Sequence, residues 1–471
     1  MLLLLAPVLT CDVGLNWGVA CAGMWRWLCA SLVLVGFEAQ AAPVNAPAKK
    51  DQPFAFLGEL GQVMAATERY YVEPVERQQL LEGALRGMIG KLDPHSAWLD
   101  KKEYAELLED TEGKFGGIGI EVDLRGEQVT VLAPIEGGPS ERAGIKSGDR
   151  ILAVDGQSLE MIGLEKLVSR LRGAPGTKVT LLVIGPAPKA NAQKAPKADP
   201  PKPRTVQITR EVIHVPSVSK KLLTEDVLYV RLKQFQEGSH LELVKAVAAL
   251  RTELAGRAPR GVLLDLRSNP GGLVNEAVEI ADEFMDGGTV LTMRARGRIT
   301  EEVRASRGGA LLGVPAVVLM NEWSASAAEL LAGALQDSGV ARVVGANSFG
   351  KGSVQTILEL AGGSALKLTT ARYFTPKGHA VQADGIHPDR VAVAKPEDPS
   401  TVLPIVRERD LPGALPGDGT AHADRAPHED YKGQPGEYAV PRDTPVDPRK
   451  GDDGVLKIAF EELLRMPMKK R

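Results

Sequence analysis

The sequence predicts a multi-domain protein of mixed α/β class, an α+β arrangement built around an α/β core. Near the N-terminus apolar residues recur with helical spacing, and in the middle short strand-like runs are separated by Gly and Asp turns. In the second half, apolar strands alternate with helical segments, which is the rhythm of an α/β layered domain. A chain of 471 residues has room for about three domains of roughly 150 residues each.

Composition excludes several functional classes. The chain has 57 basic and 60 acidic residues, so its net charge of -3 gives no field that would attract nucleic acid. Aromatic residues make up only 4%, which leaves little material for base stacking. All three cysteines lie in the first thirty residues, at Cys11, Cys21 and Cys29. A mature chain without that region has no cysteine nucleophile, zinc ribbon or disulfide scaffold.

Residues 1–41 are predicted to be a signal peptide or a membrane anchor. Arg26 precedes an apolar run from Trp27 to Phe37, and residues 39–41 form the small-x-small pattern that a signal peptidase accepts. The run is shorter than the about 20 apolar residues of a transmembrane helix. Export to the periplasm is therefore expected. The apolar residues before Met24 leave two alternatives open, an uncleaved anchor in the inner membrane or an unused upstream start codon.

Four further regions follow the leader. Residues 54–112 are expected to form a helical domain, and residues 113–210 a compact β-rich module. In that module, residues 185–204 form a Pro/Ala/Lys-rich loop that interrupts a hairpin. The predicted strands of the module are Gly117 to Val122, Gln128 to Leu132, Arg150 to Val154, Val179 to Ile184 and Thr205 to Ile208, with a helix from Leu164 to Leu171.

The α/β core is expected at residues 211–395, followed by a Pro- and Asp-rich tail, 396–471, with a terminal helix from Val455 to Leu464. Alternating strands and helices are predicted in the core: Val227 to Leu232, Leu241 to Leu254, Gly261 to Leu266, Leu273 to Met285, Ala316 to Met320, Ala327 to Leu335 and Arg342 to Val344.

Three segments that follow buried strands of this core could carry chemistry, since ligand sites gather there in α/β folds. The first segment runs from Asp265 to Gly272. Its Pro-Gly-Gly turn presents backbone N–H groups without a nearby Cβ, as an oxyanion hole requires. The alternative is a tight strand-to-helix turn without chemistry. Gly271 and Gly272 are the candidate donors, and the choice between them stays open.

The second segment, Asn321 to Glu329, runs from a strand into a helix and contains Ser326. A serine at a helix N-terminus meets developing negative charge with the positive end of the helix dipole and with free amides, notably that of Ala327. The alternative for such a serine is a helix N-cap.

The third segment, Ser348 to Gln355, places Lys351 between two glycines, so that backbone can surround the lysine and exclude water. A lysine in water titrates near 10.4, which leaves about one molecule in a thousand neutral around pH 7.5, so burial is needed to make it a base. Gln355 could orient the amine if the segment is helical. A solvated turn is the alternative.

Residues 345–351 also match the first seven positions of a phosphate-binding P-loop. The eighth position fails, because Gly352 stands where that motif needs Ser or Thr to hold magnesium. Metal-protease, serine-elbow and dithiol motifs are missing from the sequence. His379 and His387 could each pair with a serine, but both fit turn-forming roles in a stretch whose acids are Asp384 and Asp389.

At these residues the sequence resembles the carboxy-terminal processing proteases, also called tail-specific proteases. Their nucleophile lies in a Ser-Ala-Ser segment, their base in Phe-Gly-Lys-Gly 25 residues later, and an assisting glutamine four beyond. Ser326, Lys351 and Gln355 match that spacing. The Asn-Pro-Gly-Gly turn and residues 373–378 and 384–389 match as well. The likeness covers about residues 54 to 393. Trp323 and Ala328, which flank the nucleophile, depart from the usual Gly and Ser.

The resemblance implies a crotonase-like α/β protease core with an inserted PDZ domain. Gly117, Ile118, Gly119 and Ile120 look like the PDZ carboxylate loop, where consecutive amides hold a terminal carboxylate while the peptide adds a strand to the sheet. We therefore expect a serine endopeptidase that cleaves proteins near their C-termini, as a homo-oligomer, with an adaptor or activator protein among its partners. No cofactor or metal is expected. A PDZ adaptor on an inactive protease scaffold is the second hypothesis.

Overall fold

The computed structural model describes residues 55–125, 128–159, 163–186, 201–393, 405–418, 445 and 447–468. The predicted leader, residues 1–41, lies outside these residues. The chain divides into two units, residues 1–75 and 76–471. In the first unit the structure describes α1 (Ala55–Tyr70), whose Leu57, Leu60 and Val63 side chains are exposed. No helix in the described part of the chain is long and apolar enough to cross a membrane.

The second unit begins with two helices of the region 54–112, which the sequence predicts to be helical. These are α2 (Arg77–Ile89) and α3 (Lys101–Glu112). Helix α3 starts at a capping box, in which the Asp100 carboxylate accepts from the Glu103 amide and the Glu103 carboxylate accepts from the Asp100 amide. Between the helices lies a strand that the sequence does not reveal, β1 (Ala97–Leu99), which pairs with β18 (Ala365–Phe374).

The β-rich module is an insertion closed by a pair of strands. Strand β2 (Lys114–Gly117) enters it and β9 (Glu211–His214) leaves it, and the two pair antiparallel. Between them one sheet has the order β3-β4-β5-β7-β8, with β6 paired to β5. Its elements are β3 (Ile120–Arg125), β4 (Gln128–Pro134), α4 (Pro139–Arg142), β5 (Arg150–Val154), β6 (Gln157–Ser158), α5 (Leu164–Leu171), β7 (Lys178–Ile184) and β8 (Arg204–Thr209).

Two predictions for this module have clear outcomes. The antiparallel pairing of β7 with β8 confirms that the Pro/Ala/Lys-rich loop interrupts a hairpin. The single strand predicted from Gly117 to Val122 is wrong, because the chain leaves strand geometry at Ile118 and Gly119, where Gly119 has φ of 69°. Glycine is the residue that adopts such a left-handed conformation without a steric cost.

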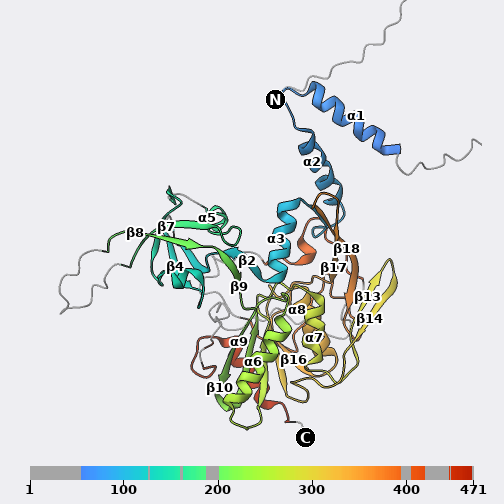
Figure 1. The fold of residues 1–471 in the computed structure, drawn as a ribbon. Coiled ribbons are helices and arrows are strands. Elements are labelled where there is room, and N and C mark those ends of the chain that lie inside the picture. Colours follow the sequence, from blue (N-terminus) through green and yellow to red (C-terminus); the bar gives the residue numbers. More distant parts are fainter. Residues whose placement is uncertain are drawn as a thin grey trace, which may run out of the picture. The chain divides into compact units, whose positions relative to one another are not determined.

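The core sheet has the order β10-β11-β12-β15-β16-β19, and its neighbours from β11 to β19 are parallel. Figure 1 shows β10 and β16 of this sheet in the same part of the view as α6, α7, α8 and α9 (Gly454–Arg465). Its strands and the helices between them are β10 (Val218–Leu223), the 3-10 turn η1 (Thr224–Asp226), β11 (Val227–Leu232), α6 (Ser239–Glu253), β12 (Gly261–Asp265), α7 (Val274–Asp282), β15 (Ala316–Met320), α8 (Ala327–Asp337), β16 (Ala341–Gly345) and β19 (Arg390–Val391). The alternation predicted from the sequence is thus confirmed.

Both faces of this sheet are covered, which explains why β12 and β15 are continuous apolar runs and not alternating patterns. Leu264 and Val318 belong to the cluster formed with α6, α7 and α8. Leu263 and Val317, one position earlier in each strand, belong to the cluster formed with α9 (Gly454–Arg465). The predicted terminal helix therefore completes the second face of the core.

A further sheet has the order β1-β18-β13-β14, and β17 also pairs with β18. Its remaining members are β13 (Thr289–Ala295), β14 (Arg298–Arg304) and β17 (Ser353–Glu359). Strand β17 directly follows the Lys351 loop. The pairing of β1 with β18 brings residues 93–96 beside Thr369, where the Thr369 amide donates to Ser96 Oγ at 3.0 Å.

Candidate active site

The three segments singled out in the sequence come together at one edge of the core sheet. Strands β12, β15 and β16 are parallel neighbours, so the loops after their carboxyl ends meet. Backbone hydrogen bonds join these loops. Ala325 N donates to Asn269 O at 2.9 Å, and Phe349 N donates to Ser324 O at 3.0 Å. The glycine turn, the serine turn and the lysine loop thus form one site.

Ser326 lies immediately before α8 in a strained conformation, with φ of 55° and ψ of -118°. A non-glycine residue rarely adopts positive φ, and holding it there costs on the order of 1–3 kcal/mol. The side chain is half-buried at the helix N-terminus. A hydroxyl in this position faces the positive end of the α8 dipole.

Glu329 holds the serine turn and the lysine loop together. It is fully buried in the first turn of α8. Its Oε2 accepts from the amides of Ser326 at 2.8 Å and Lys351 at 2.9 Å. Its Oε1 accepts from the Gly350 amide at 2.6 Å and from the Ser348 hydroxyl. Burial raises the pKa of Glu329 to about 7, although these hydrogen bonds act in the opposite direction.

Tyr373, on β18, links the same two segments. Its hydroxyl is 2.7 Å from the carbonyl oxygen of Ser326 and 2.7 Å from that of Lys351. The ring is buried. Ser326 and Lys351 therefore share two partners, a carboxylate that binds both amides and a phenol that binds both carbonyls.

Lys351 lies in the irregular stretch between β16 and β17, and its side chain is half-buried. Burial lowers the pKa of Lys351, and the Lys367 ammonium lowers it further. The carboxylates of Glu408, Glu329 and Asp93 act in the opposite direction, but the pKa stays below its ordinary value. Among the described residues, no hydrogen bond joins the Lys351 amine to the Ser326 hydroxyl. Such contacts are often long before substrate binds.

Gln355 does not lie on a helix, so the helical geometry considered for it is wrong. It belongs to β17, whereas Lys351 precedes this strand in an irregular stretch. Its Nε2 donates to Ser353 Oγ at 3.0 Å and to Thr369 Oγ1 at 3.3 Å. Thr369 Oγ1 in turn donates to Asp93 Oδ1 at 3.1 Å. Gln355 thus belongs to a polar chain near Lys351.

The two candidate glycines have different surroundings. Gly271 lies against the serine, since a Cβ at Gly271 would be 2.7 Å from the Ser326 Cβ. Its amide donates to Asn269 Oδ1 at 2.9 Å. Gly272 approaches Phe235 so closely that a Cβ would be 2.1 Å from the Phe235 carbonyl oxygen. Both positions therefore require glycine.

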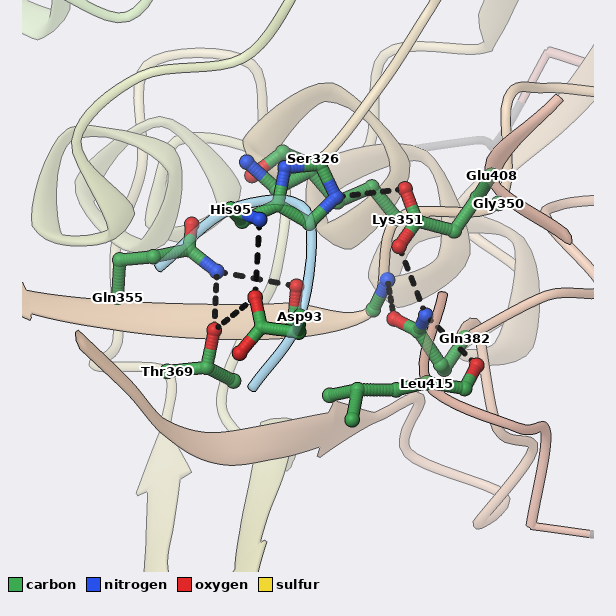
Figure 2. Close-up of polar contacts among 12 residues, drawn as sticks. Asp93, His95, Ser326, Gly350, Lys351, Gln355, Thr369, Gln382, Glu408 and Leu415 are labelled. Atoms are coloured by element: carbon green, nitrogen blue, oxygen red, sulfur yellow. Dashed lines mark hydrogen bonds and ion pairs between the residues drawn. The ribbon is translucent and has the colours of Figure 1, made fainter. Parts of the chain in front are cut away.

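A histidine and a carboxylate that the sequence gave no reason to pair lie beside this site. His95 Nε2 is 2.7 Å from Glu408 Oε2, and Gln382 Nε2 donates to Glu408 Oε1 at 2.9 Å. Figure 2 shows the ring of His95 directed at Glu408, with Asp93 and Thr369 on the other side of His95. Residues 313 positions apart in the chain thus meet here.

The structure shows what surrounds the P-loop match and the two histidines that could pair with a serine. The loop that matches a P-loop leads into β17, so no helix N-terminus follows it to bind phosphate. His387 Nε2 is 3.0 Å from Asp384 Oδ1, and His379 Nδ1 is 3.6 Å from Asp337 Oδ2. Neither histidine forms a hydrogen bond with Ser326 within the described residues.

The β-rich module contains a cavity of about 210 Å³ between β3 and α5. It is lined by all four predicted carboxylate-loop residues, Gly117, Ile118, Gly119 and Ile120, together with Phe115, Val122, Val168, Leu171 and Arg172. Within its sheet β3 pairs only with β4 among the described strands, so its other edge faces the cavity. An extended peptide can add to such an edge.

Comparison with known proteins identifies the family. Residues 226–392 match the model of peptidase family S41, residues 130–185 that of the PDZ domain, and residues 27–103 that of the activating protease CtpB N-terminal domain. The carboxy-terminal-processing protease of Bartonella bacilliformis is 36% identical over 368 residues, which cover 78% of this chain and 80% of that protein. The chain belongs to the carboxy-terminal-processing protease family. As a member, it is a serine protease with a PDZ domain.

A second relative agrees with this membership. The carboxyl-terminal-processing protease of Picosynechococcus sp. is 37% identical over 350 residues, 73% of this chain and 80% of that protein. Among solved structures, the photosystem II D1 C-terminal processing protease is 29% identical with a TM-score of 0.41, covering 76% of this chain and 93% of that one.

Of the residues that the sequence did not single out, Glu329 carried a signal. It is the one charged residue in the apolar run from Ala325 to Leu335. A buried charge needs partners, so its isolation in a core helix pointed to a role. Tyr373 begins the segment 373–378 that matches the family pattern, but no role was predicted for it from the sequence. His95 and Glu408 carried no comparable signal, because their contact joins segments distant in the chain.

Proposed function

We propose that this chain is a serine/lysine endopeptidase that holds the C-terminal tail of a protein substrate on its PDZ domain and cleaves the substrate near that end. Ser326 is the nucleophile and Lys351 the general base. The observation that carries this proposal is that Ser326 and Lys351 share Glu329 and Tyr373 as direct partners. This arrangement fixes the two backbones together while burial favours the neutral amine.

In the proposed reaction, Ser326 Oγ attacks the peptide carbonyl carbon as its proton passes to Lys351 Nζ. The C–N bond of the tetrahedral intermediate then breaks, and the Lys351 ammonium protonates the leaving amine. Water, deprotonated by the neutral amine, attacks the acyl-enzyme and releases Ser326. No cofactor takes part in these steps.

The oxyanion is assigned to the amides of Ala327 and one glycine of the 271–272 pair. Ala327 begins α8, so its N–H has no partner within the helix. The Gly271 amide already donates to Asn269 Oδ1. This bond favours Gly272 as the second donor, although Gly271 lies closer to the serine. Gln355 is assigned a positioning role through Thr369, since its contacts do not include Lys351.

Tail capture is assigned to the cavity beside β3. Its lining by Ile118, Ile120, Val168 and Leu171 favours an apolar C-terminal side chain, and the loop at Gly119 presents backbone amides for the carboxylate. Trp323, half exposed three residues before the nucleophile, is positioned to shape the subsite next to the cleaved bond.

Digestion of an unfolded protein with an apolar C-terminal tail tests the proposal. Wild type should cleave it, and Ser326→Ala and Lys351→Met should not, while both variants still bind the tail. Ser338→Ala, at the other end of α8, is the matched control and should retain activity. Equal cleavage by wild type and Ser326→Ala would remove Ser326 from the reaction. Tail binding without cleavage by wild type would favour the adaptor hypothesis.

We also propose export to the periplasm, a homo-oligomeric state and control by an adaptor or activator protein. The N-terminal apolar run supports export, and residues 27–103 match the N-terminal domain of an activating protease. N-terminal sequencing of the periplasmic protein decides whether the leader is cleaved. Light scattering of the purified protein measures the oligomeric state, and a monomer at working concentration would refute the homo-oligomer.

A further inference from the structure

A short segment beyond the matched protease core contacts the lysine loop. The family match ends at residue 392, whereas Arg407 and Glu408 lie in the described segment 405–418. Glu408 begins a 3-10 turn, η3 (Glu408–Asp410), and is fully buried. The Arg407 amide donates to Asp410 Oδ2 at 2.9 Å, which fixes the start of this turn.

Arg407 and Glu408 together cap three successive carbonyls that lead to Lys351. Arg407 Nη1 donates to the carbonyl of Asn347 at 3.0 Å and to that of Ser348. The Glu408 amide donates to the carbonyl of Phe349 at 3.2 Å. Since residues 347–349 belong to no helix or strand, these bonds supply partners that regular structure would otherwise provide.

The Glu408 side chain reaches the other side of the loop. Its Oε1 accepts from Gln382 Nε2 at 2.9 Å, and Gln382 Oε1 accepts from the Gly352 amide at 3.0 Å. The other carboxylate oxygen of Glu408, Oε2, contacts His95 Nε2 at 2.7 Å. Lys351 therefore lies between carbonyls held by Arg407 and Glu408 and an amide held through Gln382. Figure 2 shows the Gln382 side chain directed at Glu408.

The charges around Lys351 come from several elements. Glu408 and Asp93 lie on loops, Glu329 on α8 and Lys367 on β18. Glu408 itself faces His95 and Lys351. Burial raises the pKa of Glu408, but hydrogen bonds from His95 and Gln382 outweigh burial, so the pKa lies below its ordinary value. Glu408 is therefore ionised at neutral pH and attracts the Lys351 ammonium.

We propose that Arg407 and Glu408 form a clamp that positions the Lys351 loop, and that the negative charge of Glu408 beside this loop favours the protonated amine. The clamp acts through Lys351 and rests on the proposed role of Lys351 as the base. It fixes the amine where the reaction needs it, and it restrains the reaction at low pH by favouring the protonated state. Neutralising Glu408 removes that attraction, so Lys351 loses its proton at lower pH.

The charge of Lys351 can be followed without catalysis. In the inactive Ser326→Ala protein, brief acetic anhydride pulses at increasing pH acetylate neutral amines, and mass spectrometry quantifies the product at Lys351. We expect Glu408→Gln to move the labelling midpoint to lower pH, because glutamine can still accept from Gln382 and donate to His95. Glu283→Gln is the matched control. Glu283 is also a mostly buried carboxylate paired with a histidine, 2.8 Å from His240 Nε2, but it does not act on Lys351.

A labelling midpoint in Glu408→Gln equal to that of wild type and Glu283→Gln would overturn the charge role of the clamp. The positioning role has its own readout. Arg407→Met should speed hydrogen exchange in peptides covering residues 346–353 and lower kcat more than it changes KM. Unchanged hydrogen exchange in residues 346–353 would overturn the positioning role. If Glu408→Gln does not fold, the exchange result for Arg407→Met tests the clamp by itself.

The same variants in active enzyme separate this inference from the proposed function. If Glu408→Gln moves both the labelling midpoint and the acid limb of kcat/KM to lower pH, the clamp and the role of Lys351 are both supported. If labelling moves and the rate profile does not, the clamp stands and Lys351 is not the base.

Discussion

The hydroxyl of Tyr373 lies 2.7 Å from the carbonyl oxygen of Ser326 and at the same distance from that of Lys351. A phenol has one hydrogen, so it donates to the two carbonyls in turn or shares the hydrogen between them. The contact ties the proposed nucleophile to the proposed base through a residue that need not touch substrate. Removing this one hydroxyl oxygen is therefore expected to change the position of Ser326 relative to Lys351.

Tyr373→Phe should lower kcat about tenfold with little change in KM, because the buried ring still packs while both carbonyls lose the hydrogen bond from the phenol. The free energy of unfolding should fall by about 1 kcal/mol. Steady-state kinetics and denaturant titration measure the two effects. Tyr229→Phe, which removes the buried hydroxyl bond to Asp265, is the control. An equal fall in kcat in both variants would show a general loss of stability and no specific role.

Glu329→Gln should reduce kcat/KM by more than tenfold. Each carboxylate oxygen accepts two hydrogen bonds, so an amide NH₂ in either orientation faces at least one backbone amide and leaves that donor unpaired. Kinetics at saturating and limiting substrate check this result. Activity within twofold of wild type would mean that the serine turn and lysine loop do not need this bridge.

Glu329 should also make stability depend on pH in an unusual direction. Its pKa is about 7 in the folded protein against an ordinary value of 4.5, so the native state binds the extra proton between these values. The stabilisation is fully present below about pH 4.5 and is lost as pH rises through about 7. It amounts to at most about 3 kcal/mol. Thermal unfolding of wild type and Glu329→Gln between these pH values measures it. The wild-type midpoint should fall with rising pH relative to the variant, and parallel curves would contradict this assignment.

A charge in the PDZ cavity should weaken tail capture without affecting the chemistry. Val168→Asp places a carboxylate in the cavity next to the proposed site of the substrate carboxylate. KM for a protein with an apolar tail should rise tenfold or more, while cleavage of a short peptide lacking the tail should be unchanged. Ser169→Asp, at the neighbouring exposed position of α5, is the control. Unchanged KM in Val168→Asp would place tail recognition elsewhere.

Much of the core could be predicted because its elements have strong local signals. The bounds of β11, β15 and α5 agree with the sequence-based ranges, since each is an apolar or periodic run bounded by turn residues. The sequence also placed the glycine turn, Ser326 and Lys351 after buried strands, and the parallel order of these strands in the structure brings the three following loops to one edge.

The rest depends on contacts that sequence periodicity does not encode. Gln355 was considered on a helix because its spacing from Lys351 is four, whereas pairing with β18 makes it part of a strand. Strand β1 is three residues long, and only its pairing with β18 brings Asp93 to Thr369. The contact between His95 and Glu408 joins two loops from opposite ends of the chain, so neither residue has a local pattern that indicates the other.

The most direct test of the account is the rate at which a fluorophosphonate modifies Ser326, measured by mass spectrometry as a function of pH. The account predicts a single adduct on Ser326, a rate that rises with pH as Lys351 loses its proton, and no adduct in Lys351→Met. Modification of Ser326 in Lys351→Met at the wild-type rate, or an adduct at another residue, would contradict it.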